Sequence, residues 1–160
     1  MSSNSHDANR STTVVRADLG HLEQVIPLFD AYRVFYEQQS DLIASRRFLE
    51  QRIERDESVV FVANYDSEAV GFTQLYPVFS STALSRLWLL NDLFVAPPAR
   101  RLGVARALMS RAKTWASETK ALGLFLRTAV DNLPAQALYE SMGYIRDTKF
   151  YRYDRILDQF

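Results

Sequence analysis

The stretch Leu93–Ala105 reads LFVAPPARRLGVA, and it decides the fold more than any other part of the chain. Apolar residues that suit a strand lead into two prolines, a turn with two arginines and one glycine, and the start of an amphipathic helix. Such a turn directs unpaired backbone N–H groups and the positive end of a helix dipole at one point. Gly103 has no Cβ, so a ligand can approach the backbone there. The stretch therefore predicts an anion site, above all for phosphate.

Two familiar phosphate motifs do not fit this turn. No Gly-Lys-Ser/Thr sequence follows it, and its single glycine is too few for a dinucleotide fingerprint. Taken alone, the segment equally suits a tight strand-to-helix turn with two solvated arginines, so both interpretations stay open at this point.

The elements on either side of this turn alternate between strand and helix patterns. Before it we expect the strands Thr12–Arg16, Val59–Ala63, Val70–Tyr76 and Arg86–Val95, a helix over 22–36 that Pro27 bends or interrupts, and a helix capped by Asp41. After it we expect a helix from Val104 to about Lys120, the strand Leu124–Val130, a short helix from Asn132 to Gly143, and terminal strands at Tyr144–Ile145 and Lys149–Tyr153. This order predicts one α/β domain over residues 12–160, preceded by a disordered tail over residues 1–11.

Composition excludes several classes of function. The chain has 160 residues, a size that buries roughly 70% of its unfolded surface. Its 19 basic and 19 acidic side chains cancel, which argues against nucleic acid as a partner. No apolar run reaches about 18 residues, and the N-terminus lacks an apolar signal region, so we expect a cytoplasmic protein with no membrane segment. Without cysteine and with only two histidines, a metal site, a thiolate nucleophile and a histidine triad are all disfavoured.

A second segment, Asp131–Tyr144, reads DNLPAQALYESMGY and follows the next predicted strand. Together the two segments resemble the GNAT superfamily of acyl-CoA-dependent N-acetyltransferases. The cofactor motif Arg/Gln-x-x-Gly-x-Gly/Ala is matched by Arg100, Gly103 and Ala105. The downstream motif Asn-x-x-Ala-x-x-Leu-Tyr-x-x-x-Gly-Tyr/Phe is matched by Asn132, Ala135, Leu138, Tyr139, Gly143 and Tyr144.

This resemblance implies a mixed, mostly antiparallel sheet that splays at the cofactor site and is flanked by about four helices. It implies acetyl-CoA as co-substrate, no metal, and a homodimer. The residues that match the family's cofactor-binding positions are Leu93, Phe94, Val95, Arg100, Arg101, Leu102, Gly103, Val104, Ala105, Asn132 and Leu138.

Tyr139 matches the tyrosine that protonates the departing thiolate in this family. A phenol titrates near 10, so it is protonated at neutral pH and can donate to developing negative charge. The alternative role for Tyr139 is packing in the core.

Asp92 is the candidate for handling the amine. Family members that act on small amines or polyamines often carry an acidic pair at this point, and this chain keeps only the second acid, as Asn91-Asp92. We expect Asp92 to hold an ammonium or accept its proton, and Asn91 to orient the amine. A structural alternative is an ion pair between Asp92 and Arg86 or Arg127.

Tyr32 and Tyr36 are further substrate-binding candidates on the first helix. Their spacing, with that of Phe35, equally suits a core face, and we expect at least two of these three rings in the core.

The expected function is direct transfer of acetyl from acetyl-CoA to a primary amine in a ternary complex, because the chain offers neither cysteine nor a Gly-x-Ser-x-Gly elbow for an acyl-enzyme. The acceptor is expected to be a small-molecule amine or polyamine. The alternatives are an amino acid, drug or protein amine, a CoA-binding sensor without turnover, and a phosphate-binding module for nucleotides.

Overall fold

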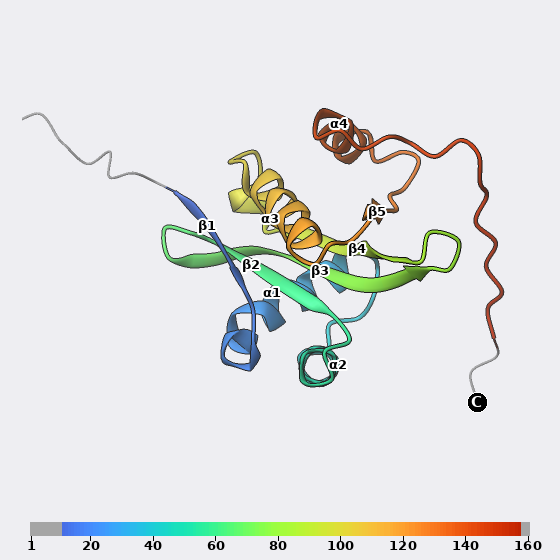
Figure 1. Ribbon diagram of the computed structural model, residues 1–160. Coiled ribbons are helices and arrows are strands. Elements are labelled where there is room, and N and C mark those ends of the chain that lie inside the picture. The colour runs from blue at the N-terminus through green and yellow to red at the C-terminus, as the bar shows by residue number, and fades with distance from the viewer. Residues whose placement is uncertain (1–10, 158–160) are drawn as a thin grey trace, which may run out of the picture. The chain divides into compact units, whose positions relative to one another are not determined.

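The computed structural model describes residues 11–157, which form two compact units, residues 11–127 and residues 128–157. The first unit holds the whole β-sheet and three of the α-helices, and the second holds the fourth (Figure 1). The predicted disordered tail lies outside the described residues except for Ser11.

The elements follow the predicted order over most of the chain. The strands are β1 (Thr12–Arg16), β2 (Val59–Tyr65), β3 (Glu68–Ser80), β4 (Ser85–Val95) and β5 (Gly123–Leu126). The α-helices are α1 (Leu22–Phe35), α2 (Leu42–Glu54), α3 (Val104–Glu118) and α4 (Leu133–Ser141), with short 3₁₀ helices at Leu19–His21 and Pro97–Ala99.

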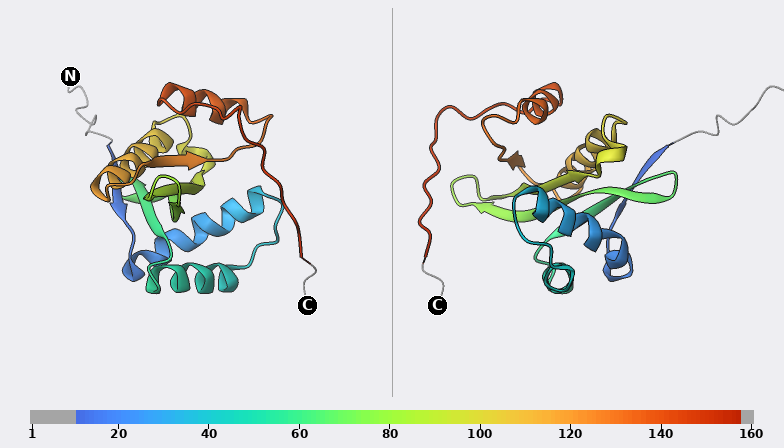
Figure 2. Two further views of the ribbon diagram at one scale, coloured as in Figure 1. Left: turned by 45° about the vertical axis from the view of Figure 1, so that its right-hand side comes forward. Right: turned by 180° about the vertical axis from the view of Figure 1, so that it is seen from behind.

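The five strands form one mixed sheet in the order β1-β2-β3-β4-β5. All neighbours are antiparallel except β4 and β5, which run parallel. Helices α1 and α2 cover one face, and α3 covers the other (Figure 2). The sheet and the four helices confirm the predicted fold class.

Each face of the sheet has its own apolar core. On the α1 and α2 face, Val25, Phe29 and Leu49 pack with the strand residues Val60 and Phe72. On the other face, Trp115 of α3 meets the rings of Phe61 and Trp88, each with centroids 6.1 Å away.

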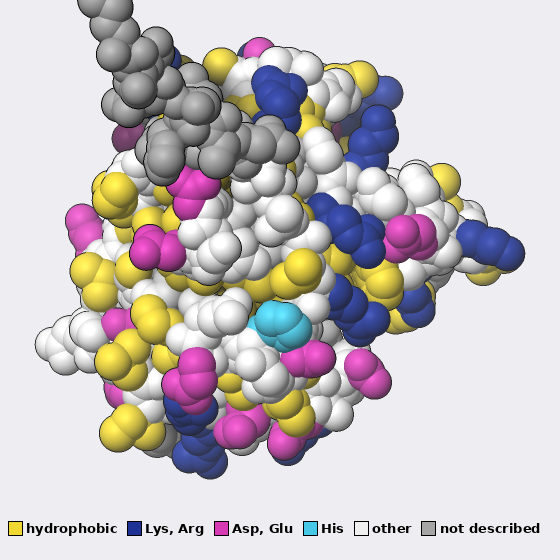
Figure 3. Space-filling view, turned by 90° about the vertical axis from the view of Figure 1, so that its left-hand side faces the viewer, with side chains coloured by type: hydrophobic (Ala, Val, Ile, Leu, Met, Phe, Trp, Pro, Cys, Tyr) yellow, Lys and Arg dark blue, Asp and Glu magenta, His cyan; other side chains and the backbone are white. Residues whose placement is uncertain are grey.

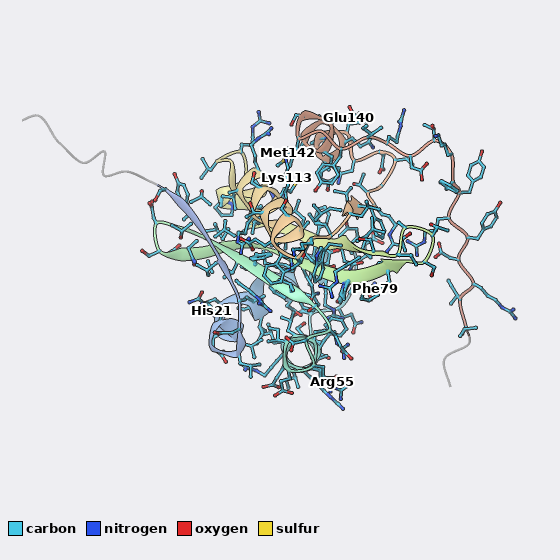
Figure 4. All side chains as sticks on the ribbon, in the orientation of Figure 1. His21, Arg55, Phe79, Lys113, Glu140 and Met142 are labelled. Carbon is cyan, nitrogen blue, oxygen red and sulfur yellow. The ribbon has the colours of Figure 1, made fainter. Side chains whose placement is uncertain are left out.

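Local signals explain why α1 begins where it does. Asp18 and His21 form a capping box at the 3₁₀ helix Leu19–His21, which leads directly into α1 (His21 is labelled in Figure 4). The Asp18 carboxylate accepts from the N–H of Gly20 at 2.8 Å, and His21 Nδ1 accepts from the N–H of Asp18 at 3.3 Å. Pro27 does not end the helix, because the buried residues on either side of it, Ile26 and Leu28, are held in the core while the proline ring is exposed.

A β-bulge in β4 changes which way its side chains point. Gln74 pairs with Asp92, and Leu75 pairs with Leu90, so Asn91 is one extra residue. Trp88, before the bulge, packs on α3, whereas Phe94, after it, joins the core of α1 and α2. In a regular strand both would share one face, because side chains alternate with period 2. The bulge thereby turns Asp92 toward α1.

The sheet splays at the same place. Strand β5 pairs with β4 only from Leu87 to Leu90, and within residues 11–127 no strand continues along that edge to Val95. The N–H of Ala96 donates to the carbonyl of Val70 on β3 at 2.8 Å. Since backbone groups alternate along a strand, the N–H groups of Leu93 and Val95 point to the opposite, open edge.

The C-terminal strands predicted at Tyr144–Ile145 and Lys149–Tyr153 are wrong, because residues 142–157 contain neither helix nor strand. Strand β5 is also shorter than predicted and ends at Leu126. An apolar run forms a strand only where another strand supplies its hydrogen bonds, and no strand of the described chain pairs with these segments. No helix among residues 11–157 is long and apolar enough to cross a membrane.

Charged and hydrophobic side chains lie interspersed on the face of the molecule that carries His21 (Figure 3). This mixture accords with a formal net charge of zero.

Candidate functional site

Asp92 is a buried carboxylate held by neutral donors. Its side chain is turned inward by the bulge, and the residue is only 5% exposed. Gln74 Nε2 donates to Oδ2 at 2.9 Å, and Asn91 Nδ2 donates to Oδ1 at 3.0 Å. The Tyr32 side chain on α1 also hydrogen-bonds this carboxylate. The structure thus brings together three predicted site residues, Tyr32, Asn91 and Asp92.

No arginine or lysine neutralises Asp92 in the part of the chain that the structure describes. The guanidinium of Arg86 lies instead over the rings of Phe79 and Trp88, 5.5 and 5.4 Å from their centroids, so the alternative ion pair with Arg86 is wrong. Arg127 forms no such pair either. Burial raises the pKa of Asp92, and the hydrogen bonds from Gln74, Tyr32 and Asn91 offset this only in part. A buried carboxylate without a counter-ion is suited to receive a cationic ligand.

Aromatic rings of α1 lie next to this carboxylate. Tyr32 packs edge-on against Phe72 and Phe94, with ring centroids 5.8 and 6.3 Å apart. Tyr36 makes a similar contact with Tyr32 at 5.0 Å. Phe35 and Tyr36 are 58% and 52% exposed, so the expectation that two of the three rings lie in the core is wrong. The buried residues of α1 all lie between Leu22 and Asp30, and the later part of the helix leaves the core.

The turn after β4 has the geometry expected of an anion site. Gly103 has φ +82° and precedes the first residue of α3, and no side chain caps the N–H groups of the first turn. A Cβ built on Gly103 would have no atom within 4 Å, so the space over this backbone is open. Val104 is 1% exposed, and its side chain packs next to Gly71 of β3. Leu102 is exposed and Ala105 is half-buried.

Arg100 has a structural contact as well as a charge. Its Nε donates to the carbonyl of Val95 at 3.0 Å on the open edge of β4, and its guanidinium lies 6.0 Å from the centroid of the Phe35 ring. The neighbouring Arg101 is exposed and has φ +64°. Of the other predicted residues on β4, Leu93 is half-buried and Phe94 is buried against α1.

Two residues of this site, Gln74 and Ser58, were not predicted from the sequence. Gln74 is completely buried in β3, and its Oε1 accepts a hydrogen bond from Ser58 Oγ at 2.9 Å. Ser58 lies just before β2 and is 5% exposed. The available signal was a long polar side chain inside an apolar strand, because a buried glutamine must find partners.

The second unit carries the downstream motif. Asn132 accepts from the N–H of Ala135 at 3.3 Å and caps α4, as predicted. Gln136 Nε2 donates to the carbonyls of Ala129 and Val130 at 3.1 and 3.0 Å, which fastens the loop before the helix. Tyr139 is half-buried, with its ring centroid 6.2 Å from that of Tyr144.

Leu138 of α4 is also half-buried. Gly143 adopts φ +86° just after the helix, a conformation that favours glycine and explains why the helix ends there.

A sheet that splays beside a helix begun by glycine defines the class of acyl-CoA-dependent acetyltransferases, and comparison with known proteins agrees. The sequence matches the "Acetyltransferase (GNAT) family" over residues 22–144. The chain therefore belongs to this family, whose members use acetyl-CoA, and is an acetyltransferase.

Individual relatives support the same assignment. The chain is 47% identical over 129 residues to "Uncharacterized N-acetyltransferase YhfO" of Bacillus subtilis (strain 168), covering 81% of this chain and 87% of that protein. It is 26% identical over 136 residues to a thialysine N-epsilon-acetyltransferase of Caenorhabditis elegans, covering 85% and 84%. A crystal structure of a probable acetyltransferase superposes with a TM-score of 0.87 at 46% identity and covers 92% of this chain and 99% of that one.

Proposed function

We propose that this protein transfers acetyl from acetyl-CoA directly to a small primary amine or polyamine, with both substrates bound together. The observation that carries the proposal is the buried Asp92 carboxylate, which has no cationic partner among residues 11–157 and lies where β4 begins its open edge. A substrate ammonium would supply the missing positive charge.

The open edge of β4 and the following turn suit acetyl-CoA. The backbone of Leu93, Phe94 and Val95 would pair with the pantetheine arm, and the N–H groups from Arg101 to Ala105 would bind the pyrophosphate beside Arg100. Acetyl-CoA supplies the acetyl group as an activated thioester. The N–H of Val95 points to the open edge and is the candidate donor to negative charge that develops on the carbonyl oxygen.

Proton transfers are assigned to two side chains. Asp92 would hold the amine and accept its proton, directly or through water. Tyr139 would protonate the thiolate that leaves, an assignment that rests on its place in the downstream motif. Asn132 and Leu138 would border the cofactor arm on the same basis.

Within this proposal, the site suits a small amine with one ammonium better than a polyamine with several charges. Asn91 replaces the first acid of the acidic pair, so one carboxylate remains to hold one ammonium. Tyr32 and the exposed ring of Tyr36 would contact the rest of the molecule, since an aromatic face attracts cations and apolar groups. The relative named for thialysine bears a name that fits a small amine acceptor.

A panel assay tests this function. The purified protein is mixed with acetyl-CoA and spermidine, n-butylamine, lysine, thialysine or kanamycin, and release of CoA thiol is measured. We expect turnover with one or more small amines, and a fall in kcat/KM of roughly 10²-fold in Asp92→Asn. Asp41→Asn is the matched control, because asparagine caps a helix as well as aspartate does. Equal activity in Asp92→Asn and Asp41→Asn would refute the role of Asp92.

We also propose a homodimer, on the family resemblance. Light scattering after size-exclusion chromatography tests it directly: a mass near 37 kDa is expected for two chains of 18.4 kDa, and a mass of one chain would contradict it.

A further inference from the structure

A line of buried hydrogen bonds runs from the residue before β2 to the proposed acceptor site. Ser58 Oγ donates to Gln74 Oε1 at 2.9 Å, and Gln74 Nε2 donates to Asp92 Oδ2 at 2.9 Å. All three residues are buried, at 5%, 0% and 5% exposure. Water therefore cannot easily replace either bond, and loss of one partner leaves a buried polar atom unsatisfied.

The two partners of Gln74 fix the orientation of its amide. The carboxylate of Asp92 accepts only the NH₂ end, and the hydroxyl of Ser58 satisfies the oxygen end. Without Ser58, the amide oxygen would lose its donor, and only the carboxylate would hold the amide against the flipped orientation, which directs its oxygen at Asp92.

A count of acceptor positions shows what is left for a substrate. An ionised carboxylate accepts about four hydrogen bonds. Gln74, Asn91 and Tyr32 supply three of them to Asp92. About one position remains, which is what a single bound ammonium requires.

We propose that Ser58 and Gln74 are positioning residues for the acetyl transfer: they hold the Asp92 carboxylate so that its remaining acceptor position faces the amine. This inference rests on the proposed function, and it assigns roles to two residues outside the family motifs quoted above.

Burial raises the pKa of Asp92, and two tyrosines lie among the groups around it. Tyr32 faces it from α1, and Tyr76 lies on β3. Burial, with the nearby charge of Asp92, raises the pKa of Tyr76 to about 12, so this phenol stays protonated in the working range. Arg52 and Glu57 act on Tyr76 from α2 and the loop after it and pair with one another.

The test uses the full chain and the best amine from the panel. Gln74→Met keeps the length of the side chain and removes both hydrogen bonds. Because the charged carboxylate loses a donor, the pKa of Asp92 should rise further. The ascending limb of kcat/KM against pH should move up by the same amount, and kcat at neutral pH should fall roughly 10-fold. The carboxyl pKa is read independently by ¹³C NMR of aspartate-labelled protein, with Asp92→Asn identifying the signal.

Ser58 is tested by removal and rescue. Ser58→Ala should shift the limb in the same direction, and Ser58→Thr, which keeps the hydroxyl, should restore it. Ser45→Ala is the matched control, because it also removes a hydroxyl from a buried carboxylate, that of Asp30. It should lower the melting temperature without moving the pH profile.

The outcomes separate the two proposals. If the wild type acetylates amines and folded Gln74→Met keeps both the Asp92 titration and the pH limb, the positioning role is refuted and the proposed function stands. If the wild type acetylates no amine of the panel, the proposed function fails and the positioning role fails with it. If Ser45→Ala shifted the pH limb as much as Ser58→Ala does, the positioning role would also be overturned, because the shift would then reflect lost stability alone.

Discussion

Removal of the Asp30 carboxylate should destabilise the protein strongly and change its response to acid. Asp30 lies on α1 and accepts hydrogen bonds from Ser40 Oγ at 2.6 Å, the N–H of Asp41 at 2.8 Å and Ser45 Oγ at 3.1 Å. These bonds fasten the start of α2 to α1, and Asp30 is only 6% exposed. The perturbation is Asp30→Ala, with Asp30→Asn as the variant of equal volume.

The magnitude follows from the bonds lost. A hydrogen bond to a charged group contributes about 1.5–3 kcal/mol, and a buried donor left unpaired adds a penalty. Three such bonds are not additive, so we expect Asp30→Ala to lower the free energy of unfolding by about 3–5 kcal/mol. For a chain of this size that is roughly 10 °C in Tm. Asp30→Asn should cost less, because its amide still accepts from some of the donors.

The pH dependence has a defined sign. The hydrogen bond from Ser40, followed by those from Asp41 and Ser45 and the nearby Arg33, lowers the pKa of Asp30 although burial opposes this. A lowered folded pKa means that the carboxylate stabilises the fold fully above the unfolded value of about 3.9 and loses this effect as the pH falls through the folded pKa. Asp30→Asn removes the titrating group, so its loss of stability relative to wild type should shrink at low pH.

The assay is urea unfolding followed by tryptophan fluorescence between pH 3 and 7. A loss below about 1 kcal/mol in Asp30→Ala would refute the reasoning, because surface substitutions have effects of that size. The reasoning would also be refuted if the difference in free energy of unfolding between wild type and Asp30→Asn stayed constant down to pH 3.

Three further predictions concern the proposed cofactor turn, the proposed protonation of the thiolate by Tyr139, and the packing of the sheet. Gly103→Trp should abolish CoA binding, measured by calorimetry, because its side chain fills the open space over the turn. Gly103→Ala adds the strain of φ +82° without the bulk, so it should lower the free energy of unfolding by about 1–2 kcal/mol and still bind CoA measurably. Unchanged affinity in the Trp variant would place the phosphate elsewhere. Tyr139→Phe should lower kcat roughly 10²-fold with little change in the Kd for CoA, and wild-type turnover would remove this phenol from the mechanism. Gly71→Ala should lower the free energy of unfolding by about 2 kcal/mol and Tm by several degrees, because its Cβ would lie 2.8 Å from the carbonyl oxygen of Phe94. The Cβ of Gly123→Ala meets no atom within 4 Å, so this control should change Tm little. Equal changes of Tm in the two variants would contradict the clash.

Much of the backbone could be predicted from local signals. Pro97 and Pro98 restrict φ after β4, and Gly103 suits the positive φ before α3. The end of β4 and the start of α3 can therefore be predicted from adjacent residues. The cap on α4 by Asn132 and the start of α2 after Asp41 are local in the same way. In each case the chain's own atoms a few residues away make the decisive bond.

The terminal strands show the limit of such reasoning. Lys149–Tyr153 has the aromatic composition of a strand and forms none, because strand hydrogen bonds come from a partner segment that composition does not specify. Phe35 and Tyr36 continue the helical spacing of α1 yet lie exposed, because the spacing does not say where the helix leaves the sheet.

By itself, then, the sequence determined the order of the elements up to α4, the glycine turn and both family motifs, and it singled out Asp92 in β4 as a candidate acid. Only the tertiary structure decided how Asp92 is placed and held. The register between β3 and β4 makes Asn91 a bulge, which turns Asp92 toward α1 and sets it opposite Gln74, with Tyr32 beside it. Register and bulges arise from pairing between strands, and hydrogen bonds across 16 or 18 residues of sequence have no local signature.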